Sequence, residues 1–440
     1  MRISKIPFYF VIASLFLPII AAYTRSIYVT YFIDVFTLSL FSIFLILGKF
    51  TISKKYIALV LLPFFLYLSF NLFNGNGIGY KSLFSIILLT YIFLTYFKSS
   101  NNPDFHYIIF RQIKFIYVFL IAALFLEMIL RIGGYDNLLF KPISTESLIH
   151  SMNPAMAEAG AVKLYKFYNA ADFFKYVGFQ NMTGLNSLLL GSQAASQIVA
   201  NGIVIFCPFY YGSSISSLKD KYLLFLTCIV FYPFVATQTS NLILIIIFLI
   251  FLFILPNSKL KNVYTKLSFP LITISFIGLL PLILFRVSRF DDLKIYIDAW
   301  MEPINLWIKV NSFDKLFGLG DTVSGLLNSS DFGFGILFLS LGLIPFIFLL
   351  SLIFLLIIKT LSLIKISMNK NIIKDPWVYL GSVNIMCVIA LFLSLFHYTQ
   401  ILELGGRHIF TFHLATGYIC IEKIKKAIEL EDLKENIFNS

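Results

Sequence analysis

R-V-S-R-F-D-D-L-K-I-Y-I-D-A-W, at residues 286–300, directly follows an apolar segment that ends at Phe285. L-F-G-L-G-D stands at 316–321, and S-S-D-F-G-F-G-I-L-F-L-S-L-G-L-I-P-F-I-F-L-L, at 329–350, returns the chain to an apolar run. The polar and aromatic segment between the two apolar runs is too long for a simple connection, because loops without a function rarely exceed about 15 residues. We therefore expect residues 286–332 to form one wall of a functional site.

The composition of the chain predicts an all-α integral membrane protein. Of its 440 residues 59% are hydrophobic and only 13% are charged, whereas a soluble protein carries about 25% charged residues. Repeated apolar runs are long enough to cross a bilayer as helices. The net charge of +12 does not indicate a nucleic-acid partner, because the lysines lie between the apolar runs, where they orient a membrane protein.

We predict about twelve transmembrane helices in a single polytopic domain that comprises residues 1–440. The predicted spans are 6–23, 28–48, 56–73, 82–97, 113–130, 187–209, 222–236, 241–255, 268–285, 333–358, 377–396 and 409–421.

The distribution of basic residues predicts the orientation of these helices. If the N-terminus is cytoplasmic, the inner segments hold most of the 34 lysines and arginines, and the short outer loops hold only Arg25, Lys81 and Arg407. Short loops follow the positive-inside rule, so both termini are expected in the cytoplasm. Residues 422–440 then form a cytoplasmic tail, predicted to be a mixed-charge helix. The two long loops, 131–186 and 286–332, fall on the outer side.

Cysteine and metal-ligand patterns are not prominent in the sequence. The four cysteines lie within or at the end of apolar segments and show no CxxC spacing, so they are interpreted as small core residues. No H-E-x-x-H motif, paired D-x-D or cysteine–histidine cluster occurs. We therefore predict neither a metal site nor a cofactor.

The sixth predicted span carries three amides at intervals of four residues, Gln193, Gln197 and Asn201, which places them on one helical face. Two interpretations remain open. The amides could hold the bundle together through interhelical hydrogen bonds, or they could line a cavity that admits sugar hydroxyls.

Arg286 and Arg289 open the second long loop and share a helical face if the ninth span continues by one turn. The fork of donors on arginine suits phosphate oxygens, although interfacial snorkelling also explains the two residues. Asp331 closes the loop directly before the tenth span. It is a candidate for substrate binding or for the N-terminal cap of that span.

The last outer segment, H-Y-T-Q-I-L-E-L-G-G-R-H at 397–408, is dense in ionisable groups. Histidine near the membrane surface can act as a base or bind a phosphate. His397 and His408 are therefore candidate catalytic bases, with Glu158 of the first long loop as a third candidate. Arg407 is a candidate phosphate ligand.

This pattern resembles the O-antigen polymerase family (Wzy-type) within the polymerase and ligase superfamily of bacterial surface polysaccharides. The resemblance rests on two long outer loops among about twelve spans, on L-F-G-L-G-D followed by S-D-F-G-F-G-I-L-F-L-S-L-G-L-I-P-F, and on arginines that open the second loop. One departure is T-Q-T-S-N at 237–241, where Asn241 replaces an arginine that is frequent in relatives.

The resemblance implies a GT-C-like, metal-independent glycosyltransferase in the bacterial inner membrane. Its substrate would be an undecaprenyl-diphosphate-linked oligosaccharide, joined to the growing chain at the periplasmic face to build lipopolysaccharide. A sugar hydroxyl would attack an anomeric carbon and displace undecaprenyl diphosphate, so cations are needed on the diphosphate and a base near the hydroxyl. Membrane lipids, a chain-length regulator and the flippase of the same pathway are the implied partners.

Three other functions are considered. An O-antigen ligase differs from the polymerase only in its acceptor. A lipid-linked oligosaccharide flippase should carry charged residues through many spans and lack long outer loops, and a solute permease should show inverted halves with matched broken helices. Neither transporter pattern is visible in this sequence.

Overall fold

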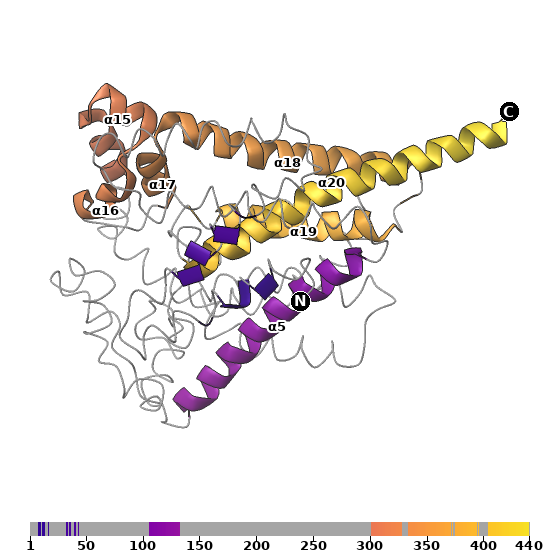
Figure 1. Cartoon of the computed structure of the whole chain (residues 1–440), viewed down its shortest axis with the longest axis horizontal. Helices are drawn as coiled ribbons and strands as arrows, with labels where there is room; N and C mark the ends of the chain where they lie inside the picture. Colours follow the sequence, from indigo (N-terminus) through magenta and orange to yellow (C-terminus); the bar gives the residue numbers. More distant parts are fainter. Residues whose placement is uncertain are drawn as a thin grey trace, which may run out of the picture.

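The computed structural model describes residues 105–132, 301–327, 333–370, 375–393 and 404–439, together with Ile372, Leu395 and scattered residues between 8 and 43. Within these residues the structure is helical and contains no β-strand. Figure 1 shows their arrangement. The elements are α5 (Phe105–Ile132), α15 (Ser312–Phe317), η4 (Gly320–Thr322), α16 (Val323–Leu326), α17 (Gly333–Leu341), α18 (Leu343–Asn369), α19 (Pro376–Leu393) and α20 (Leu404–Asn439); residues 301–309 are also helical.

Helix α18 is the one described helix that is long and apolar enough, by length and composition, to cross a membrane. From Ile344 to Ile358 its large exposed side chains are as apolar as its buried ones: Ile344, Ile347, Phe354, Leu355 and Ile358 face outward, whereas Leu349, Leu352, Ile353 and Leu356 are buried. Exposed polar residues such as Lys365 and Asn369 follow towards the end of the helix. A helix on the surface of a soluble protein carries polar residues on its outer face. The exposed face of α18 therefore suits lipid, or another apolar surface, better than water.

Helices α18, α19 and α20 pack together, and their contacts give the direction of each helix. The Tyr418 hydroxyl donates to the Leu352 carbonyl over 3.0 Å, and Lys370 forms an ion pair with Asp432. From the first contact to the second, the residue numbers increase along both helices, so α18 and α20 run parallel. Asn384 contacts His413, whereas Trp377, earlier in α19, contacts Lys423. Helix α19 is thus antiparallel to the other two, and the three helices form an alternating bundle (Figure 1).

Helix α5 lies against α19 through aromatic contacts. The His106 ring meets Trp377 with centroids 5.5 Å apart, and Phe110 meets Tyr379 at 6.4 Å. The order of these pairs shows that α5 runs parallel to α19. The helix also begins eight residues earlier than the predicted span 113–130, because F-H-Y-I-I-F-R-Q, at 105–112, continues it despite the polar residues His106, Arg111 and Gln112.

The N-terminal residues that the structure describes pack on α5. Phe8 lies edge-on to Phe115 at 5.4 Å, and Phe16 lies 4.6 Å from Phe119. The two pairs follow the same order along both segments. The first helical segment therefore runs in the direction of α5.

The predicted span 333–358 is wrong as one continuous helix. The chain breaks at Gly342, whose φ of 76° lies in the left-handed region, and α17 and α18 are separate helices on either side of it. Helix α18 then continues to Asn369, eleven residues beyond the predicted end. The break was not visible in the hydropathy of the sequence, because α17 and α18 are both apolar.

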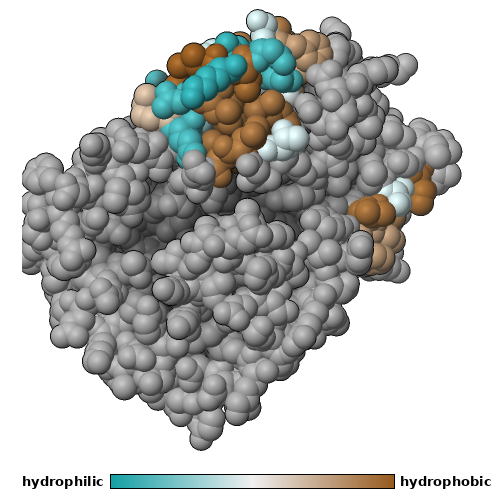
Figure 2. Space-filling model, turned by 90° about the vertical axis from the view of Figure 1, so that its left-hand side faces the viewer, coloured by the Kyte–Doolittle hydropathy of each residue, from teal (hydrophilic) through white to brown (hydrophobic). Residues whose placement is uncertain are grey.

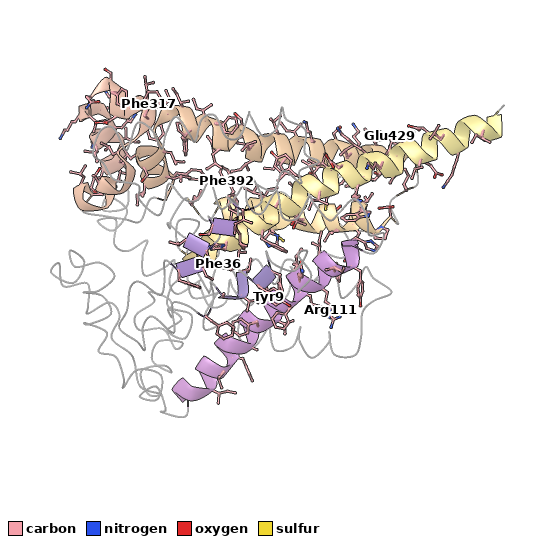
Figure 3. The ribbon with its side chains drawn as sticks, in the orientation of Figure 1. Tyr9, Phe36, Arg111, Phe317, Phe392 and Glu429 are labelled. Carbon is pink, nitrogen blue, oxygen red and sulfur yellow. The ribbon has the colours of Figure 1, made fainter. Side chains whose placement is uncertain are left out.

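Helix α20 is much longer than the predicted span 409–421. It extends from Leu404 to Asn439 without interruption, which corresponds to about 54 Å. The mixed-charge tail at 422–440 is thus helical, as predicted, but it continues the same helix. Figure 3 shows Glu429 on this extension, far from Phe317 at the opposite end of the described bundle.

Helix ends are fixed by polar side chains. The Asn311 side-chain oxygen accepts the Asp314 N–H at 2.8 Å and caps α15. The Asp375 carboxylate accepts the Trp377 N–H at 2.7 Å, with Pro376 as the first residue of α19. A capping carboxylate followed by proline is a strong helix start.

Candidate functional site

Of the predicted site residues, the structure describes the side chain of His408 and the backbone of Arg407. The remaining candidates lie outside the described residues: His397, Glu158, Arg286, Arg289, Asp331, Gln193, Gln197 and Asn201. Around these two residues, the structure describes the end of the bundle where α17 meets α18 and where α20 begins.

The first turn of α20 places a basic residue at a helix N-terminus. Leu404, Gly405, Gly406 and Arg407 form this turn, and the first four backbone N–H groups of a helix have no partner within it. The positive end of the helix dipole adds to the arginine charge. This end of α20 therefore favours an anion, and the role of Arg407 in binding one stays a prediction.

His408 follows in the same helix, and its side chain is fully buried. Its backbone carbonyl accepts the Thr411 hydroxyl at 3.0 Å. The imidazole is held within the packed bundle and is not exposed to solvent in this conformation. Its role as a base stays a prediction.

The second long loop ends in a close contact between two glycines. Gly318 has a φ of 85° and Gly342 a φ of 76°. A Cβ on Gly318 would lie 2.6 Å from the Gly342 nitrogen, and a Cβ on Gly342 would lie 2.5 Å from the Phe317 carbonyl carbon. The Leu319 N–H also donates to the Leu339 carbonyl at 2.8 Å. The chain thus turns tightly at Gly318–Gly320, and this turn packs L-F-G-L-G-D against the break between α17 and α18.

The turn after this glycine contact is stabilised locally. Gly320 also has a positive φ, 60°, and the Thr322 hydroxyl donates to the Leu319 carbonyl. Helix α16 begins directly after it and packs on α17. Residues 316–326 are thus one compact unit fixed to the start of α18.

Sequence reasoning missed a polar pair inside the bundle. Asn384 of α19 and His413 of α20 are both fully buried. The Asn384 amide donates to the His413 backbone carbonyl at 2.8 Å, and its oxygen lies 2.9 Å from His413 Nδ1. One asparagine therefore contacts both the backbone and the side chain of the same histidine. The available signal was a lone amide within the apolar run of α19, a position where polar groups are costly unless paired.

A glycine makes room for this pair. Gly417 lies one turn after His413, and a Cβ there would lie 3.1 Å from the Asn384 amide nitrogen and 2.9 Å from Leu356 Cδ1. Helices α18 and α19 therefore both approach α20 closely at this level. Small residues at such crossings are typical of packed helices in membranes.

The opposite end of the bundle carries the basic residues of α18 and of the α20 extension. The Lys423 ammonium lies 5.7 Å from the centre of the Trp377 ring. Burial, and then the charge of Lys426, lower the pKa of Lys423, whereas Glu422 raises it. The Lys370–Asp432 ion pair lies further along the same end. The basic residues therefore lie at one end of the bundle, and Gly318 and Arg407 lie at the other.

Among the residues that the structure describes, no group of three or more histidine, cysteine, aspartate or glutamate side chains is arranged to hold a metal ion. Cys387 and Cys420 are buried and are not part of a disulfide. The other two cysteines, Cys207 and Cys228, lie outside the described residues.

Comparison of the chain with protein-family models, with curated proteins and with solved structures gives no significant match. A functional assignment therefore rests on the residues of this chain and on their arrangement.

Proposed function

We propose that this protein is an O-antigen polymerase of the bacterial inner membrane, which joins undecaprenyl-diphosphate-linked repeat units at the periplasmic face. The proposal includes about twelve transmembrane helices in a GT-C-like arrangement, with both termini in the cytoplasm. It needs no metal, since arginine side chains can neutralise the departing diphosphate.

The observation that carries the proposal is the contact between Gly318 and Gly342. The two parts of the stretch that resembles the polymerase family are separated in sequence, and their described residues, 316–321 and 333–346, form one structural unit. The close approach of the two backbones explains why both parts of the stretch carry glycines. A chance similarity between apolar sequences would not require such a contact.

The directions of the helices support the proposed topology. In an alternating arrangement of twelve spans with a cytoplasmic N-terminus, the first, fifth and eleventh spans run outward and the tenth and twelfth run inward. The first segment, α5 and α19 share one direction, and α18 and α20 share the opposite one. The exposed apolar face of α18 supports a lipid environment.

The proposed chemistry assigns Arg286, Arg289 and Arg407 to the diphosphate. His408, His397 or Glu158 would remove the proton from the attacking hydroxyl. Asp331 and the amides Gln193, Gln197 and Asn201 would contact the sugar units. Of these, Arg407 and His408 lie at the end of the bundle that also holds the Gly318–Gly342 contact.

The first test is a lipopolysaccharide gel from a strain that lacks the gene. Core bearing a single repeat unit is the expected result for a polymerase. Core alone, with polymer accumulating on the lipid carrier, identifies a ligase. Core alone with unpolymerised units retained inside the cell identifies a flippase, and an unchanged ladder excludes all three.

A second test addresses the arginines. Substitution of Arg286, Arg289 or Arg407 by alanine should abolish polymer while single-unit lipopolysaccharide remains. Arg111→Ala is the matched control, because Arg111 is exposed on α5 near the basic end of the bundle (Figure 3). Normal ladders in all three arginine variants would disprove the assignment of the diphosphate site.

A further inference from the structure

We infer that the helical segments 301–309 and 312–317 lie on the outer surface of the lipid bilayer and anchor the end of the second long loop there. We call these two segments the anchor pair. The inference rests on the membrane placement proposed above but concerns a different part of the chain from the polymerase chemistry.

The anchor pair exposes apolar side chains on one face. Met301, Ile304 and Ile308 are spaced by three and four residues, so they lie on the same side of the helix. Phe313 and Leu316 of α15 add two more exposed apolar side chains. Figure 2 views the molecule from this end and shows apolar side chains exposed beside hydrophilic ones. An exposed apolar surface of this kind marks a contact site.

Aromatic contacts fix the anchor pair at the start of α18. Trp307 lies 5.5 Å from Phe338 of α17, and Phe338 lies 5.2 Å from Phe346 of α18. Helix α15 also packs directly on α18, next to the Gly318–Gly342 contact. The exposed patch therefore stands at the same end as Ile344 and Ile347, the first exposed apolar residues of α18.

This position favours lipid as the occupant. If lipid covers the exposed face of α18, the bilayer surface lies at the level of its first turns, where the anchor pair is held. Trp307 and Lys315 also form a cation–π contact over 5.5 Å. Trp307 packs inward on Phe338, whereas lysine can extend its ammonium group from apolar surroundings towards the headgroups. One lipid surface thus covers both the anchor pair and the neighbouring face of α18.

The test uses the full chain in lipid nanodiscs made of phosphatidylethanolamine and phosphatidylglycerol, without isoprenoid lipid. The photo-crosslinker p-benzoylphenylalanine is introduced separately at Ile308, Ile358 and Leu430. These apolar residues are similarly exposed, at 60%, 62% and 60%, but lie on the anchor pair, on α18 and on the α20 extension. After illumination, the intact mass of each protein is measured.

The expected result is a mass increase of one phospholipid at positions 308 and 358 and none at 430. A lipid adduct at 358 without one at 308 overturns the inference and leaves the membrane placement intact. A crosslinked dimer at 308 also overturns it, because a second copy of the chain then covers the patch. Absence of a lipid adduct at position 358 would show that α18 does not face lipid, and it would overturn both the proposed membrane placement and this inference.

Discussion

At the scale of single residues, Gly318 and Gly342 are described positions where any side chain would be strained. Each has a positive φ, a conformation that costs an L-residue about 1–2 kcal/mol. At each of them a Cβ would also collide with backbone atoms, which cannot rotate away as a side chain can. The need for glycine is therefore steric as well as conformational.

We expect Gly318→Ala and Gly342→Ala each to destabilise the protein by more than about 2 kcal/mol. Thermal unfolding of the detergent-solubilised protein measures the effect. Gly381→Ala is the matched control, because its Cβ would meet the end of the Ile424 side chain at 3.0 Å within an ordinary helix. A loss in the control as large as in the two variants would contradict this account.

The Asn384–His413 pair is the second prediction at this scale. Hydrogen bonds between helices in membranes contribute about 0.6 kcal/mol on average and up to about 1.7 kcal/mol. Asn384→Ala removes both contacts, whereas His413→Ala removes only the contact with the imidazole, because the His413 backbone carbonyl remains. We therefore expect a coupling energy near the average value, about 0.6 kcal/mol, in a double-mutant cycle of the two variants. Additive single effects would show that the two side chains do not stabilise each other.

At the scale of helices, the parallel arrangement of α18 and α20 depends on contacts far apart along both helices. Lys370 and Asp432 provide one at the basic end. A partly exposed ion pair contributes at most about 1 kcal/mol. We therefore expect Lys370→Glu or Asp432→Lys alone to lower stability by up to this amount, and the double charge swap to restore it.

The measurement for the charge swap is thermal unfolding at low ionic strength, where screening is weakest. Lys434→Glu is a useful comparison, because Lys434 pairs only locally with Glu431 over 3.1 Å. The Lys434→Glu variant tests whether any charge reversal on the α20 extension lowers thermal stability by the same amount. No recovery in the double variant would contradict direct pairing between α18 and α20.

Hydropathy predicted the existence of these helices better than their ends. The predicted span 377–396 closely matches α19, because aspartate and proline mark its start in the sequence. The break at Gly342 could not be predicted, since it depends on the approach of Gly318 from a distant segment. The length of α20 was also missed, because a hydropathy pattern ends where polar residues begin, whereas helical hydrogen bonding does not.

The candidate site was predicted less completely than the helices. Arg407 and His408 were identified because ionisable residues are conspicuous beside apolar runs, and the structure places them at the start of α20. Asn384 was overlooked because an uncharged amide in an apolar run gives a weak signal. Its partner is 29 residues away, and only the antiparallel packing of α19 and α20 brings them together.

At the scale of the whole molecule, the described helices predict on which sides of the membrane the loops lie. The Lys370–Asp432 ion pair joins the segment after α18 to the α20 extension, so both must lie on one side. The Gly318–Gly342 contact is at the other end of α18. We therefore expect the C-terminus and the second long loop to be accessible from opposite sides.

Epitope tags test this expectation. A tag after Ser440 should bind antibody only after spheroplasts are permeabilised, whereas a tag between Asn328 and Ser329 should bind in intact spheroplasts. Each variant must also produce normal lipopolysaccharide, which shows that the tag has not disturbed the fold. Exposure of both tags on the same side would contradict the proposed topology.

The continuity of α20 has a mechanical consequence. A helix of 36 residues without a break acts as a single rod, and Arg407 stands near one end of it while Asp432 stands near the other. Any twist or axial push applied at its charged end reaches the arginine directly, with no hinge between them to absorb it. In the proposed topology, α20 is a continuous helix that connects the cytoplasmic side of the membrane with the outer side, so that a partner bound to its charged end can shift Arg407.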